Sequence, residues 1–88
     1  SDISETINTL MLSGSFSSTH SAISELSDKI KYLSDEDIQK LIKASVENEQ
    51  ISWISDDEDV KEFFKNIYQT KQNIIPEDIR VQFLQHFK

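Results

Sequence analysis

The chain has 88 residues and carries 16 acidic against nine basic side chains, for a formal net charge of −7. The absence of Cys excludes a disulfide framework, a thiolate metal site and a cysteine nucleophile, and the single Gly excludes glycine-rich phosphate-binding loops. The acidity argues against nucleic-acid binding, because phosphate contacts require Lys and Arg. We expect a single domain, residues 1–88, that is either free-standing or a fragment of a longer protein.

The first two helices are predicted from apolar side chains that recur every three or four residues. The first helix spans 3–12 and follows Asp2, a residue type that caps helix N-termini well. The second spans roughly 18–33, after a serine-rich loop, and shows the same periodicity. The apolar faces comprise Ile3, Ile7, Leu10 and Met11 in the first helix, and Ala22, Ile23, Leu26, Ile30 and Leu33 in the second.

The third helix is predicted over 35–48, because Ser34 is a favourable N-cap and acidic residues fill the first turn. If this helix continued past Asn48, Ile51 and Ile54 would project away from its apolar face. We therefore expect the helix to stop at Asn48, with a break near residues 48–50. Its apolar face comprises Ile38, Leu41, Ile42 and Val46.

The last two helices are predicted over 57–69 and 77–87. Ser55 and Glu58 have the spacing of a capping box at the start of the fourth helix. Pro76 precedes the fifth helix, in a position where its missing N–H costs little. Their apolar faces comprise Val60, Phe63, Phe64, Ile67 and Tyr68 in the fourth helix, and Ile79, Phe83 and Phe87, with Leu84 at the edge, in the fifth.

These five segments predict an all-α fold, a compact bundle of about five short helices. Strand patterns are nearly absent, since the only alternating stretch covers residues 50–53 and is too short for a sheet. Three helix starts share one sequence pattern, in which an apolar residue is followed by a capping residue, then by acidic residues and then by the first core residue. Solenoid repeats have periods of about 33 to 47 residues, longer than the spacing between these starts, so we favour convergent capping over a repeat.

The negative charge is concentrated in the middle of the chain. Residues 34–60 carry nine acidic side chains against only two lysines, whereas residues 61–88 carry five basic and three acidic ones. Such a pole attracts cationic partners and raises association rates. Acids at helix starts also complement the helix dipole, so part of this charge has a structural explanation.

The best candidate for a partner-binding site is Trp53 together with the adjacent acids Asp56, Asp57, Glu58 and Asp59. Trp is enriched at interface hot spots, although a single Trp in a small bundle commonly fills the core. We expect the four acids to be solvated. They do not form a calcium loop, because that motif needs spaced acids, a Gly and a distal Glu.

No catalytic, metal or cofactor site is predicted. His20 and His86 have no second His or Cys at metal-ligand spacing, so a zinc site would need carboxylates supplied by the fold. No Ser lies in a nucleophile elbow, and the chain lacks the Asp-Ser pair that acyl carrier proteins modify. We therefore expect a non-enzymatic protein-protein interaction module with an acidic face, whose partner is another protein with a basic surface and not nucleic acid or membrane.

A second hypothesis is a small acidic inhibitor of the immunity or antitoxin type, which masks the basic site of a nuclease or toxin. In size, charge and predicted helix content the chain is similar to the immunity proteins that neutralise bacterial nucleases, and Leu33–Ile42 resembles their helix openings. Their paired tyrosines have no counterpart here, since Tyr32 and Tyr68 lie far apart in sequence. The resemblance therefore supplies an alternative function and no family assignment.

We expect a cytoplasmic location. The longest apolar run, Leu10–Leu12, is far shorter than the roughly 20 residues of a membrane span. The N-terminal segment lacks the basic and apolar regions of a secretory signal. The absence of Cys is consistent with a reducing compartment.

Overall fold

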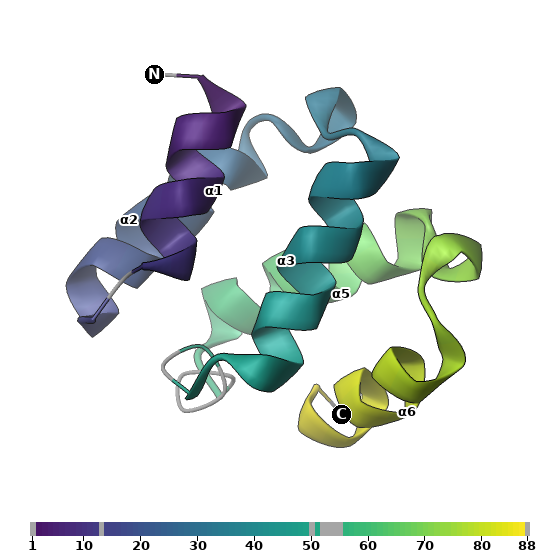
Figure 1. Ribbon diagram of the computed structural model, residues 1–88. Helices are drawn as coiled ribbons and strands as arrows, with labels where there is room; N and C mark the ends of the chain where they lie inside the picture. Colours follow the sequence, from purple (N-terminus) through teal and green to yellow (C-terminus); the bar gives the residue numbers. More distant parts are fainter. Residues whose placement is uncertain (1, 13, 50, 52–55, 88) are drawn as a thin grey trace.

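The computed structural model describes residues 2–12, 14–49, 51 and 56–87, and within these ranges five α-helices and two 3₁₀ turns are assigned (Figure 1). No strand occurs in these ranges, so the predicted all-α bundle is confirmed. The elements in chain order are α1 (Ile3–Met11), α2 (Phe16–Ser27), η1 (Ile30–Tyr32), α3 (Asp35–Glu47), α5 (Glu58–Thr70), η2 (Gln72–Ile74) and α6 (Glu77–His86).

Helix α3 lies at the centre of the bundle, where it contacts α1, α5 and α6 (Figure 1). Helix α1 packs against α2, and α2 in turn contacts α5. The start of α5 thus lies beside a helix from the first third of the chain. This arrangement brings together the residues of the candidate site.

The core is built from the apolar faces that the periodicity predicts. Each of the five helices contributes fully buried side chains, and Ile51, between α3 and α5, is also buried. Between α5 and α6 the core is aromatic, with Tyr68 stacked on Phe83 at 4.5 Å and Phe64 at 5.4 Å from Phe87 between ring centroids. Such ring pairs add to the stabilisation from burial, so this end of the bundle is held by side-chain packing.

Helix α2 differs from its prediction at both ends. It begins at Phe16 instead of residue 18, because the Ser15 hydroxyl caps it by accepting a hydrogen bond from the Ser18 N–H at 3.2 Å. It ends at Ser27, and the 3₁₀ turn η1 follows. Leu33, the extended residue directly after this turn, is buried although the α-helix has ended.

The cap of α5 also differs from its prediction. Asp57, and not Ser55, is the N-cap, because its Oδ1 accepts hydrogen bonds from the N–H groups of Asp59 at 3.0 Å and Val60 at 3.2 Å. Ser55 itself lies outside the described residues. The capping-box spacing misidentified the cap because an equally good capping residue follows two positions later.

The predicted break after α3 is confirmed at Asn48, whose backbone is extended with φ −88° and ψ 115°. Its side chain joins two segments, since Nδ2 donates to the Met11 carbonyl at 3.2 Å and Oδ1 accepts from the Ile51 N–H at 3.3 Å. The break therefore lets Ile51 turn into the core. None of the described helices is both long and apolar enough to cross a membrane.

Candidate functional site

The four acids that begin the fourth predicted helix do not share one environment. Asp56 and Glu58 are exposed, as expected. Asp57 is half-buried, with 29% of its side chain accessible, because its carboxylate lies against the backbone that it caps. Asp59 extends into solvent with 75% of its side chain accessible. The expectation that all four acids are solvated is therefore wrong for Asp57.

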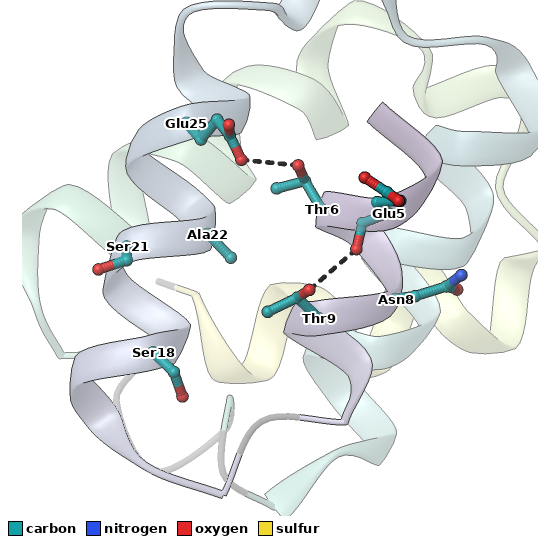
Figure 2. A pocket seen from close by; sticks show the side chains of 8 residues that line it. All are labelled: Glu5, Thr6, Asn8, Thr9, Ser18, Ser21, Ala22 and Glu25. Atoms are coloured by element: carbon teal, nitrogen blue, oxygen red, sulfur yellow. Dashed lines mark hydrogen bonds between the residues drawn. The ribbon is translucent and has the colours of Figure 1, made fainter. Parts of the chain in front are cut away.

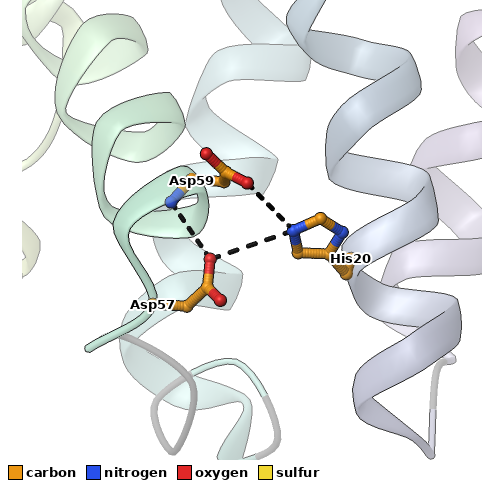
Figure 3. Close-up of side chains that lie close together, drawn as sticks. All are labelled: His20, Asp57 and Asp59. Carbon is orange, nitrogen blue, oxygen red and sulfur yellow. Dashed lines mark hydrogen bonds and ion pairs between the residues drawn. The ribbon is translucent and has the colours of Figure 1, made fainter.

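His20 on α2 lies directly opposite this helix start (Figure 3). Its Nε2 lies 3.3 Å from Asp59 Oδ2 and 3.9 Å from Asp57 Oδ1. The imidazole ring also packs against Phe16 one turn earlier, with 5.6 Å between ring centroids. The fold therefore brings two carboxylates, which are distant in sequence, next to His20.

The cluster of His20, Asp57 and Asp59 connects two helices that are distant in sequence. Thirty-nine residues separate His20 from Asp59, so the contact depends on the packing of α2 against α5. Even with His20 protonated, an exposed ion pair of this kind contributes only about 0.2–1 kcal/mol. The chemical importance of the cluster is thus its set of donor atoms and not its contribution to stability.

The start of α3 is acidic as well but is arranged differently. Ser34 and Asp37 form a complete capping box, with the serine hydroxyl and the aspartate carboxylate each accepting a backbone N–H at 3.1 Å. Lys71 pairs with Asp35 at 3.0 Å between Nζ and Oδ1. Most of the acids in this first turn therefore serve the helix itself or a neighbouring lysine.

Several acids of the middle segment have no cationic partner. Within residues 2–12, 14–49, 51 and 56–87, no ion pair is formed by Glu36, Glu47, Glu49, Asp56 or Glu58, all of which are exposed. Two of these five residues, Asp56 and Glu58, flank the capping residue of α5. They form an uncompensated negative edge at that helix start, which we call the α5 acidic edge.

A shallow polar groove runs between α1 and α2 (Figure 2). Thr6 donates to Glu25 Oε2 at 2.6 Å across the groove, and Thr9 donates to the Glu5 carbonyl at 3.0 Å. The Thr6 hydroxyl is therefore hydrogen-bonded to a carboxylate of α2, and the Thr9 hydroxyl to the backbone of its own helix. The lining residues are Glu5, Thr6, Asn8, Thr9, Ser18, Ser21, Ala22 and Glu25.

Two further residues singled out by the sequence do not join the site. Trp53 lies outside the described residues. His86 is exposed near the end of α6 and belongs to no cluster of metal-ligating side chains in the described part of the chain. The pairing of His20 with the α5 start has no local signal in the sequence, because the contact arises from tertiary packing.

Comparisons with known proteins do not assign this chain to a family. No protein-family model, no curated protein and no solved structure matches it significantly. The function is therefore inferred from the geometry of the site.

Proposed function

We propose that this chain is a non-enzymatic protein-interaction module that binds a partner with a basic surface through the α5 acidic edge. The observation that supports this proposal is that the four acids at this helix start make different contacts. Asp57 caps the helix and Asp59 faces His20, whereas Asp56 and Glu58 are exposed and have no cationic partner among the described residues.

The structural role of acids at a helix start does not account for both residues of the edge. A helix needs one N-cap, and Asp57 fills that position with two hydrogen bonds. Glu58 lies in the first turn, where it interacts favourably with the helix dipole. Asp56 precedes the cap, is exposed and forms no ion pair with the described residues, which supports a role for its charge in binding a partner.

The α5 acidic edge suits electrostatic recognition because both of its acids are exposed at the start of a helix. It is attached to a helix whose next core residue, Val60, is fully buried. Exposed charges of this kind steer a cationic partner and mainly raise the association rate. The interaction should weaken as salt increases, because exposed charges are screened over about 10 Å at 0.1 M ionic strength.

The test is affinity capture from native lysate with two charge-reversed variants of the full chain. Asp56→Lys/Glu58→Lys removes the α5 acidic edge and leaves the Asp57 cap in place. Asp35→Lys/Glu36→Lys is the matched control, since it changes the net charge equally and also alters a helix start.

The proposal predicts that the first variant loses partners that wild type and the control retain. Equal retention by all three proteins, or equal loss by both variants, would contradict it. A captured nuclease or toxin whose activity falls on binding would indicate the narrower function of an acidic inhibitor. Circular dichroism of each variant establishes that it is folded.

A further inference from the structure

We infer that His20, Asp57 and Asp59 form a binding site for a divalent transition-metal ion of the Zn²⁺ class, which would join α2 to α5. The site is distinct from the proposed partner surface, because it uses the two acids that face His20 and not the α5 acidic edge. Its ligands come from two helices that pack against each other.

The donor atoms favour a transition metal over calcium or magnesium. An imidazole nitrogen and two carboxylates are ligands that Zn²⁺ binds readily. Calcium and magnesium prefer six or more oxygen ligands and do not gain from an imidazole. The presence of His20 therefore separates this cluster from an ordinary group of surface acids.

The spacing of the donor atoms is close to what coordination needs. Ligands placed about 2.1 Å from a tetrahedral zinc ion lie about 3.4 Å from one another. His20 Nε2 and Asp59 Oδ2 are 3.3 Å apart, and the distance to Asp57 Oδ1 is 3.9 Å. One ligand atom from each of the three residues lies within 4.8 Å of the others. Small rotations of the His20 and Asp59 side chains would therefore bring their donor atoms onto an ion bound by the Asp57 carboxylate.

The surroundings of the cluster also suit an ion. The backbone N–H groups of Asp59 and Val60 hold the Asp57 carboxylate in place, as hydrogen bonds commonly orient metal ligands. About a third of the His20 side chain is accessible, at 32%, so water can complete the coordination shell. The positive end of the α5 dipole amounts to about half a charge, which the two carboxylates exceed.

The test is a titration of the full chain with Zn²⁺ alone, measured by isothermal titration calorimetry. His20→Ala removes the nitrogen ligand, and His86→Ala removes the other histidine, which is exposed and has no acidic cluster. Asp57→Asn removes a ligand charge while keeping a good N-cap, so it separates loss of the ion from loss of the fold.

We expect one zinc site per chain, weakened at least about tenfold by His20→Ala and by Asp57→Asn and unchanged by His86→Ala. An excess of Ca²⁺ or Mg²⁺ should not displace the zinc. The proposal is overturned if wild type binds no zinc, if His20→Ala binds as tightly as wild type, or if Ca²⁺ competes equally. Partner capture by the α5 acidic edge is a separate readout, so each of the two proposals can fail alone.

Discussion

The starts of α3 and α5 have nearly the same sequence pattern, but their surroundings in the fold differ. At the start of α3, the capping box closes within four residues, and Lys71 neutralises Asp35. At the start of α5, Asp57 alone makes the cap, and the neighbouring acids face either His20 on another helix or the solvent. Among the described residues, the α3 start thus leaves one exposed acid, Glu36, without a cationic partner, whereas the α5 start leaves two, Asp56 and Glu58, and also contacts a histidine on α2.

This difference shows that a run of acids cannot be assigned a role from its sequence alone. Both runs stabilise their helices by caps and by interaction with the dipole. Only the α5 start lies where the packing of α2 presents a histidine, and only there does an exposed acid precede the cap. The α5 start is therefore the better candidate for function.

The largest expected effect is on the free energy of unfolding. It concerns a feature that both helix starts share, the buried core residue that follows the acids in sequence. Ile38 and Val60 are almost fully buried. Ile38→Ala should lower the free energy of unfolding by about 2–5 kcal/mol, with a smaller loss for Val60→Ala, because a cavity replaces packed methyl groups. Urea denaturation measures both losses. A loss below about 1 kcal/mol for Ile38→Ala would show that the acids, and not the core, hold the helix start.

A smaller effect is expected from the caps themselves. Ser34→Ala and Asp57→Ala should each lower the free energy of unfolding by about 0.5–2 kcal/mol, because each removes the acceptor of a backbone N–H. Asp57→Asn is the matched control, since Asn caps about as well as Asp. Thermal or urea unfolding distinguishes them. If Asp57→Asn were as damaging as Asp57→Ala, the charge and not the cap would be responsible.

The smallest expected effect is the coupling energy between the two charged side chains that pair at each helix start. A double-mutant cycle on His20 and Asp59 should give a coupling of about 0.2–1 kcal/mol, and so should a cycle on Lys71 and Asp35. Zn²⁺ should enlarge the first coupling and leave the second unchanged, since only the first pair offers an imidazole. Identical responses of both cycles to zinc would argue that the two starts are equivalent.

Much of the fold could be predicted from the sequence, because capping and helical periodicity are local. The caps at Asp2 and Ser34, the break at Asn48 and nearly all core residues follow from spacing alone. The start of α2 and the cap of α5 were misplaced, because several serines and aspartates can cap and the choice among them depends on packing.

The candidate site was predictable only in part. The exposed acids Asp56 and Glu58 follow from composition and position. The contact between His20 and Asp59 does not, since it spans 39 residues and needs α2 to pack against α5. A metal site was not expected, because its three ligands are brought together only by the fold.

The most direct test of the central claim is the association rate of a captured partner with the two charge-reversed variants. At low salt, Asp56→Lys/Glu58→Lys should slow association at least about tenfold relative to wild type, because the steering charge is lost. Asp35→Lys/Glu36→Lys should slow it by less than about threefold, although its net charge is the same. Equal slowing by both variants would contradict the claim, since it would show that net charge alone, and not the α5 acidic edge, attracts the partner.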